Sequence, residues 1–255
     1  MPRFAANLSM MFNEYDFLDR FQAAADAGFE AVEYLFPYDH PAETIAACLR
    51  KSGLQQALFN MPPGNWAGGD RGLAALPARR AEFEAAVGLA VDYAGIIGTP
   101  YLHMMAGIAD AGDEIAVRAY REALIFAADR TEQAGIGLVI EPINRRDMPG
   151  YFLNDFDQAL AFVTGIGRQH VKLQFDIYHR QILHGDVVMG LRAMMPHIGH
   201  IQVASVPKRN EPGTGELNDR AIFAEIDALG YSGFIGCEYR PAGRTEEGLG
   251  WLTET

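Results

Sequence analysis

The sequence predicts a single-domain (β/α)8 TIM barrel of the α/β class, extending over residues 1–255. Short apolar runs typical of buried strands alternate along the whole chain with longer segments of helical periodicity. Strict alternation implies parallel strands joined by crossover connections. Eight such units in 255 residues fit a closed barrel better than an open sheet. No linker and no shift in composition divides the chain, so we expect one domain.

The strands are expected where short stretches are filled with apolar residues. The clearest is the run Leu138, Val139 and Ile140, which ends at Glu141 and Pro142, because proline prevents a regular ladder from continuing. The other seven strands are expected at residues 3–8, 29–36, 55–60, 101–105, 171–176, 200–203 and 233–238.

Helices are expected between these strands, and glycines such as Gly28 and Gly53 indicate left-handed caps where helices end. The expected helices are 15–27, 41–51, 78–97, 113–134, 155–164, 180–195, 218–229 and 245–253. One long irregular loop, residues 61–72, follows the third strand. Loops of this length inside a compact domain tend to be functional, so its glycines and Trp66 indicate either a lid or a packed surface loop.

Oxygen-bearing side chains occur where several of the expected strands end. Glu141 follows the fifth strand, while Asp176 and Glu238 end the sixth and the eighth. Glu33 is a similar case in the second strand, and Gln202 adds an amide oxygen in the seventh. A single acid at such a place often only caps the next helix, but repetition indicates one shared site. In TIM barrels the chemistry lies at the carboxyl ends of the strands.

Three carboxylates brought together at one end of a barrel would repel one another. At ~5 Å and an effective dielectric constant of about 20, each pair costs roughly 3 kcal/mol. Either some carboxyls are protonated, or a divalent cation neutralises them, and we favour the cation. Oxygen ligands select a hard ion such as Mg²⁺ or Mn²⁺. The remaining alternative is a set of carboxylates on strand ends that do not converge.

Further polar residues near the same strand ends are candidates for substrate binding. His179, at the start of an expected helix, could donate a hydrogen bond to a substrate oxygen, although a histidine there is more often a capping or hydrogen-bonding group. His103 could line the pocket or be a satisfied core residue. Lys208 and Arg209 follow the seventh strand, where a cation is usually solvated; arginine's planar fork suits a substrate carboxylate, so we prefer Arg209. The opposite wall is expected to include Asn7, Asn60 and Trp66.

The bulk composition excludes several classes of protein. With 49% hydrophobic and 21% charged residues the chain is an ordinary globular protein. Its net charge of −12 disfavours nucleic acid as a partner. Cys48 and Cys237 are far apart, so no disulfide framework is expected. The N-terminus has no apolar signal region and no stretch is long enough to cross a membrane. We therefore expect a cytoplasmic protein, and a homo-oligomer is compatible with the sequence.

Several long motifs resemble one known family. They are RFAANLSM at 3–10, FPY at 36–38, EPIN at 141–144, FDIYH at 175–179, EPGTGE at 211–216 and CEY at 237–239. These stretches resemble the hydroxypyruvate isomerase family, which belongs to the xylose-isomerase-like TIM barrels, and the resemblance runs nearly end to end. It implies that Glu141 and Glu238 are the two acid/base carboxylates. It also implies a divalent metal held by Glu141, Asp176, Gln202 and Glu238.

The resemblance leaves the length of the substrate open. After Gln202, hydroxypyruvate isomerases typically have an Asp-Asn-Pro segment where this chain has Ser205-Val206-Pro207. The similar 2-oxo-tetronate isomerases also lack that acid, and they share the ending TEEGLGW at 245–251. The EPIN and DIYH motifs are closer to the hydroxypyruvate branch.

The reaction implied is the interconversion of hydroxypyruvate and tartronate semialdehyde through an enediolate, and the alternative is a 2-oxo-tetronate isomerase acting on a four-carbon acid. Either substrate is a small 2-keto-3-hydroxy acid. No nucleotide cofactor is expected, because no glycine-rich dinucleotide fingerprint follows a strand. Two rivals remain. A metal-dependent endonuclease with this type of barrel would need a basic groove, and a sugar-acid-binding protein would need no catalytic carboxylate.

Overall fold

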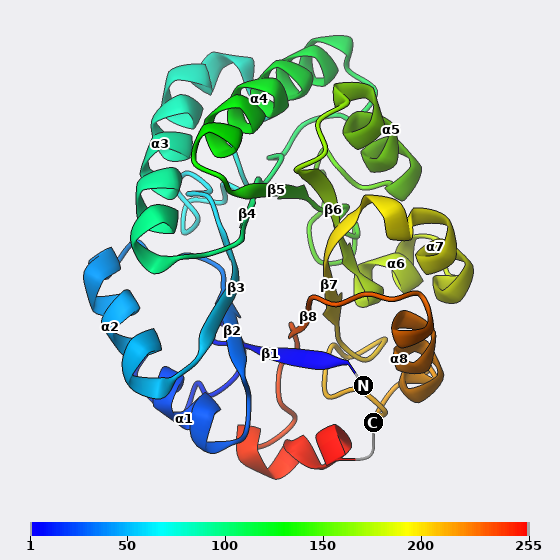
Figure 1. Cartoon of the computed structure of the whole chain (residues 1–255). Helices are drawn as coiled ribbons and strands as arrows, with labels where there is room; N and C mark the ends of the chain where they lie inside the picture. Colours follow the sequence, from blue (N-terminus) through cyan, green and yellow to red (C-terminus); the bar gives the residue numbers. More distant parts are fainter. Residues whose placement is uncertain (1, 254–255) are drawn as a thin grey trace.

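Eight parallel strands form one closed barrel in the computed structural model, which describes residues 2–253 (Figure 1). Each strand pairs with the next along the chain, and β1 (Arg3–Asn7) closes the barrel against β8 (Phe234–Cys237). The helices surround the barrel on its outside (Figure 1). The predicted fold class, a (β/α)8 TIM barrel, is confirmed.

The remaining strands are β2 (Ala31–Tyr34), β3 (Gln55–Asn60), β4 (Tyr101–His103), β5 (Gly137–Ile140), β6 (Val171–Asp176) and β7 (Ile198–Val203). The α-helices are α1 (Arg20–Asp26), α2 (Ala42–Ser52), α3 (Arg80–Ile97), α4 (Glu114–Gln133), α5 (Phe156–Ile166), α6 (Ile177–Leu183), α7 (Val187–Met194) and α8 (Asp219–Ala228). Within residues 2–253 the 3₁₀ helices are η1 (Pro77–Arg79), η2 (Met195–His197) and η3 (Thr245–Thr253).

The main apolar core fills the space between the strands and the surrounding helices. In α4, the buried residues Tyr120, Leu124 and Ala127 recur at intervals of three or four, so they share one helix face. The Tyr120 ring lies 5.0 Å from that of Phe152 and 4.8 Å from that of Phe162, measured between centroids. Burying an aromatic side chain of this kind contributes roughly 1.5–3 kcal/mol, so this packing holds the helices against the barrel.

Small residues occupy part of the barrel interior. Ala5, Ala31 and Ala57 form a separate buried cluster, against which Phe234 packs. This cluster precedes Asn7 and Glu33 along β1 and β2, so it lies toward the amino ends of the strands. The space toward the carboxyl ends is left to polar side chains.

The helix expected over 245–253 is the 3₁₀ helix η3, and two other predicted helices differ from the structure in their limits. The helix expected over 15–27 begins only at Arg20, because contacts with η3 hold the preceding residues in turns: Phe12 N donates to Thr245 Oγ1, and Thr245 N donates to Glu14 Oε1. The helix expected over 180–195 is divided into α6 and α7 at Gly185 and Asp186, both in the left-handed region.

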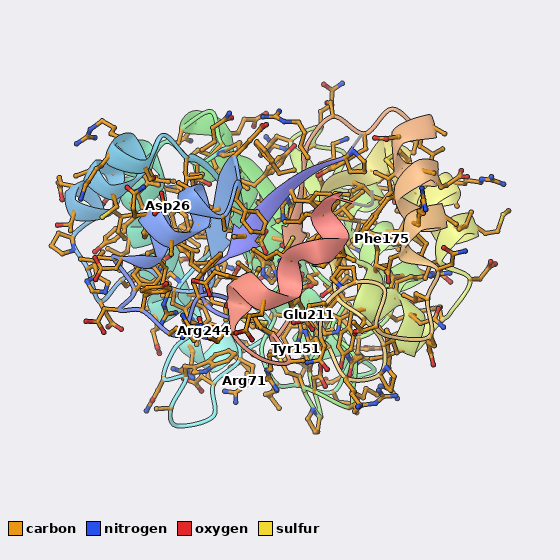
Figure 2. The ribbon with its side chains drawn as sticks, turned by 90° about the horizontal axis from the view of Figure 1, so that it is seen from below. Asp26, Arg71, Tyr151, Phe175, Glu211 and Arg244 are labelled. Atoms are coloured by element: carbon orange, nitrogen blue, oxygen red, sulfur yellow. The ribbon has the colours of Figure 1, made fainter. Side chains whose placement is uncertain are left out.

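The loops that follow the strands gather at the carboxyl end of the barrel. Arg71, Tyr151 and Arg244, which belong to three such loops, lie toward the same end in Figure 2. The Tyr151 hydroxyl is buried and accepts a hydrogen bond of 2.8 Å from Ala106 N, which ties two of these loops together. Among residues 2–253, no helix has both the length and the apolar character needed to cross a bilayer.

Candidate active site

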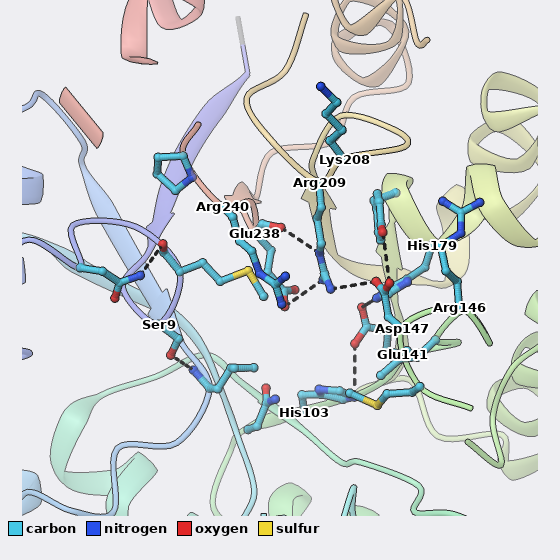
Figure 3. Close-up of a pocket in the computed structure, with 18 of the residues that line it drawn as sticks. Ser9, His103, Glu141, Arg146, Asp147, His179, Lys208, Arg209, Glu238 and Arg240 are labelled. Atoms are coloured by element: carbon cyan, nitrogen blue, oxygen red, sulfur yellow. Dashed lines mark hydrogen bonds and ion pairs between the residues drawn. The ribbon is translucent and has the colours of Figure 1, made fainter. Parts of the chain in front are cut away.

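The four residues expected to converge do stand at the carboxyl ends of adjacent strands. Glu141 directly follows β5, Asp176 ends β6, Gln202 lies in β7 and Glu238 directly follows β8. None is more than 6% exposed. Glu141 and Glu238 line one cavity of about 850 Å³ at this end of the barrel (Figure 3). The two carboxylates thus share a pocket large enough for a small organic acid.

The same cavity collects most of the residues predicted to bind substrate: Asn60, Trp66, His103, His179, Lys208 and Arg209. Trp66 packs against Phe36, with ring centroids 5.1 Å apart, and the Arg71 guanidinium lies 4.0 Å from the centroid of the Trp66 ring. Asn7 differs from the others, because it is absent from the lining and its Nδ2 donates to the buried Glu33 at 2.9 Å.

Glu141, Asp176 and His179 form a group that could hold a metal ion, since each has a ligand atom within 4.8 Å of the others. Glu141 Oε1 and Asp176 Oδ2 are buried and have no hydrogen-bond partner within residues 2–253. Buried carboxylate oxygens are normally paired or bound to a cation. The two oxygens therefore fit a hard divalent cation, which prefers such ligands.

His179 enters this group with a defined tautomer. Its Nδ1 receives the backbone N–H of Asn144 at 3.3 Å and faces the Asn144 side-chain amide at 2.6 Å. The Asn144 oxygen is taken by Asp147 N, so its Nδ2 is the atom that faces His179. Because Nδ1 accepts, the proton resides on Nε2. That Nε2–H points toward Glu141 and Asp176, at 3.9 and 3.6 Å, and can donate to a ligand.

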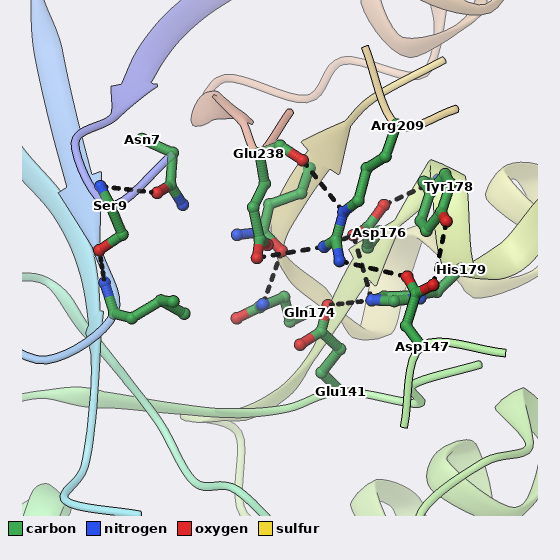
Figure 4. A network of polar contacts seen from close by, with 12 residues as sticks. Asn7, Ser9, Glu141, Asp147, Gln174, Asp176, Tyr178, His179, Arg209 and Glu238 are labelled. Carbon is green, nitrogen blue, oxygen red and sulfur yellow. Dashed lines mark hydrogen bonds and ion pairs between the residues drawn. The ribbon is translucent and has the colours of Figure 1, made fainter. Parts of the chain in front are cut away.

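Arg209 is held among carboxylates at the centre of the site (Figure 4). Its Nη2 lies 3.1 Å from Glu238 Oε1 and 3.5 Å from Asp176 Oδ2, and its Nη1 lies 3.4 Å from Asp147 Oδ2. The guanidinium also stacks on the Tyr178 ring at 4.8 Å. Arg209 is therefore the counter-ion of the site. The neighbouring Lys208 is exposed.

Burial dominates the protonation of these groups. It raises the pKa of Glu141 well above its usual range, and the charges of Glu238 and Asp176 raise it further. Burial likewise raises the pKa of Asp176 to about 6 and that of Glu238 to about 8, in both cases against the opposing charge of Arg209. Without another cation, the cluster therefore retains protons near neutral pH.

The two histidines of the cavity are neutral. Burial, then the positive charge of Arg209 and to a smaller extent the neighbouring His103, lower the pKa of His179 well below its usual value. Burial, with a smaller contribution from His200, lowers the pKa of His103 to about 3. His103 Nε2 lies 3.9 Å from Glu141 Oε2. Neutral imidazoles can donate or accept hydrogen bonds here without adding charge.

A second polar layer lies beneath the carboxylates, and two of its members, Gln174 and His200, were not predicted from the sequence as part of the site. Glu33 accepts from Asn7, Gln202 and His200, and Gln174 Nε2 donates to Gln202 Oε1 at 2.6 Å. Strand periodicity could have revealed both. Gln174 precedes Asp176 by two residues and His200 precedes Gln202 by two, and residues i and i+2 of a strand point to the same side.

Comparison with known proteins supports the fold and the likeness to isomerases. A family model described as the xylose isomerase-like TIM barrel matches residues 21–255. A 2-oxo-tetronate isomerase of Cupriavidus necator is 56% identical over 99% of this chain and 98% of its own length. A hydroxypyruvate isomerase of Escherichia coli is 42% identical, with the same shares covered. The crystal structure of a protein described as AP endonuclease, family 2, from Brucella melitensis is 46% identical, covers 100% of this chain and 99% of its own, and superposes with a TM-score of 0.97.

Proposed function

The chain belongs to the xylose isomerase-like TIM-barrel family, and from that premise we propose that it is an isomerase of short 2-keto-3-hydroxy acids. The observation that carries the proposal is the pair Glu141 and Glu238, two buried carboxyls with raised pKa values facing one cavity. Moving a proton between neighbouring carbons requires an acid and a base in one enclosed pocket.

In the proposed reaction, one of the two glutamates removes a proton from the carbon beside the substrate carbonyl. The hydroxyl proton of the resulting enediolate passes to the former carbonyl oxygen, and a proton returns to the former carbonyl carbon, so that carbonyl and hydroxyl exchange positions. The neutral His179 donates its Nε2 proton in a hydrogen bond to the oxygen on which negative charge develops. Arg209 favours the ionised form of Glu238 and Asp176 through its ion pairs.

We propose that Mg²⁺ or Mn²⁺ is held by Glu141, Asp176, Gln202 and Glu238. Glu141 Oε1 and Asp176 Oδ2, which accept no hydrogen bond within residues 2–253, support this assignment. When bound, such an ion polarises a carbonyl oxygen as a Lewis acid. The neutral His179 keeps its Nε2 proton and is assigned to the substrate rather than to the ion.

The length of the substrate is not decided by the loop in which the sequence departs from hydroxypyruvate isomerases. Ser205 is buried, and its Oγ accepts from Asn210 N and Thr214 Oγ1, both at 3.1 Å. Ser205 is also absent from the lining of the cavity. An acid at this position would therefore act through the loop and not by direct contact, so hydroxypyruvate and the four-carbon acid are both retained as substrates.

Parallel turnover assays with the three-carbon and four-carbon acids test the proposal. We expect turnover of at least one acid, exchange of its carbon-bound proton with solvent, and loss of both on treatment with a chelator. Restoration by Mn²⁺ would support the assigned ion. Absence of turnover and of proton exchange with either acid in the presence of Mg²⁺ and Mn²⁺ would contradict the proposed activity.

Replacing Asn144 by aspartate tests the role given to His179. A carboxylate cannot donate to Nδ1, so the substitution favours the tautomer with the proton on Nδ1 and removes the Nε2 donor from the site. Loss of one such donor costs about 10²–10³ in kcat. The kcat of Asn144→Asp, together with ¹⁵N chemical shifts of the His179 ring, measures both effects. A shifted tautomer with unchanged kcat would refute the role.

The likeness to the Brucella melitensis protein described as an AP endonuclease raises a second function, cleavage of DNA at abasic sites. Arg71, Arg146, Lys208 and Arg240 line the cavity beside Arg209 and offer positive charge. The net charge of −12 opposes binding of a polyanion. Binding and cleavage of abasic DNA at low salt would establish this function, and absence of both would exclude it.

A further inference from the structure

Glu33 lies inside the barrel below the carboxylates, only 1% exposed, and both of its oxygens are used. Oε1 accepts from Asn7 Nδ2 at 2.9 Å and from Gln202 Nε2 at 2.8 Å. Oε2 pairs with His200 Nε2 at 2.6 Å. The carboxylate therefore joins three strands, and the orientation of the Gln202 amide follows from it.

The barrel provides room for this carboxylate at one defined place. A Cβ built on Gly236 would overlap both oxygens of Glu33, so only glycine fits at that point of β8. Gly236 lies in β8, two residues before Glu238, which directly follows that strand. Glu33 thus packs against β8 at Gly236 and is shielded from bulk solvent.

We propose that Glu33 is a positioning residue that holds the Gln202 amide with its oxygen toward the metal site. This inference rests on the proposed function, in which Gln202 is a ligand through Oε1. A glutamine side chain offers an oxygen at one end of its amide and two N–H donors at the other. Glu33 Oε1 accepts from the Nε2 end of the Gln202 amide, so the amide oxygen points away from Glu33.

The remaining contact of Gln202 agrees with this orientation. Gln202 Oε1 accepts a hydrogen bond of 2.6 Å from Gln174 Nε2, so the amide is fixed from both ends. An amide oxygen has a second lone pair, which remains for a cation. Gln202 also lines a small internal cavity together with Glu141, Glu238 and Asn60, which places its amide beside two of the other proposed ligands.

The test measures binding of Mn²⁺ by titration calorimetry to the purified, chelator-treated full chain. The glutamine of Glu33→Gln can accept or donate, so the Gln202 amide is then oriented by Gln174 alone. Removing a partner that orients a metal ligand typically weakens metal binding by about 10- to 100-fold, and we expect a loss in this range. Glu211→Gln is the matched control, because it also replaces a buried glutamate by glutamine but lies outside the lining of the cavity, and it should weaken binding by less than about threefold.

Exchanging the two groups provides the rescue. In Glu33→Gln/Gln202→Glu the new amide can donate to the new carboxylate, which reverses the hydrogen bond and again presents an oxygen to the cation. We expect this double variant to bind Mn²⁺ within about fivefold of the wild type. Gln202→Glu alone places two carboxylates in contact, so it should unfold at a lower temperature than the double variant.

The outcomes separate this inference from the proposed function. If the wild type binds Mn²⁺ and Glu33→Gln binds it equally well, or if Glu211→Gln weakens binding as much, the positioning role is wrong and the metal site stands. If the wild type does not bind Mn²⁺, both fail. If Glu33→Gln does not fold, the double variant is compared with Gln202→Glu instead. Equal Mn²⁺ affinity and equal unfolding temperature in these two variants would overturn the inference.

Discussion

Replacing either Glu141 or Glu238 by glutamine is expected to lower kcat by about 10²–10⁴, the usual contribution of a positioned acid or base. Glutamine has nearly the same shape but cannot take up or release the proton. The measurement is kcat on whichever acid the wild type turns over, with solvent exchange of the carbon-bound proton as a second readout. Both signals should be lost in each variant, because removal and return of the proton need both carboxyls.

Both variants should remain folded and should differ in their free energy of unfolding. Measuring that free energy separates a loss of activity from a loss of fold. The pKa of Glu141 is raised by burial and by neighbouring carboxylates, so its ionised form is disfavoured and glutamine should stabilise the metal-free protein. Glu238 makes an ion pair of 3.1 Å with Arg209, which Glu238→Gln would lose, so this variant should gain less stability than Glu141→Gln. Glu14→Gln, at the edge of the same cavity, is the control with unchanged kcat. Wild-type turnover in either Glu141→Gln or Glu238→Gln would refute the acid/base assignment.

The barrel could be predicted from sequence because it depends on local signals. Apolar runs such as residues 138–140 indicate strands, and glycines such as Gly28 indicate helix ends. Both signals are contained within a few residues of sequence. Strand ends then follow from topology, which is why Glu141 and Glu238 could be expected at one end without knowledge of their contacts. The first helix was predicted too long because its limit is set by Thr245, more than two hundred residues away.

The inner half of the site needs three-dimensional information. Glu33 and His200 meet across the barrel interior, and their separation of 167 residues leaves no trace in any local pattern. Arg209 was expected as a clamp for a substrate carboxylate because it stands in a loop with free reach. Its actual partners, Asp147, Asp176 and Glu238, come from three other strand ends or loops, so only the folded arrangement shows that the guanidinium already serves as a counter-ion.

Replacing Arg209 by methionine should destabilise the metal-free protein by about 3–5 kcal/mol near pH 9, because it leaves buried carboxylates without their counter-ion. The sign of the pH dependence follows from the pKa values. Burial raises the pKa of Glu238 to about 8 and that of Asp176 to about 6, even with Arg209 present. The folded state thus binds these protons more tightly than the unfolded state, so the metal-free wild type loses stability as pH rises through this range.

Without Arg209 both pKa values rise further, and the variant loses stability faster as pH increases. Near pH 5 the carboxyls are largely protonated with or without the guanidinium, so the difference from the wild type should fall to about 1 kcal/mol or less. Urea unfolding in chelator at both pH values measures it, with the exposed neighbour Lys208→Met as control, for which we expect a change within about 0.5 kcal/mol. An Arg209→Met effect of equal size at both pH values would mean that the arginine stabilises the site by packing on Tyr178 and not by its charge.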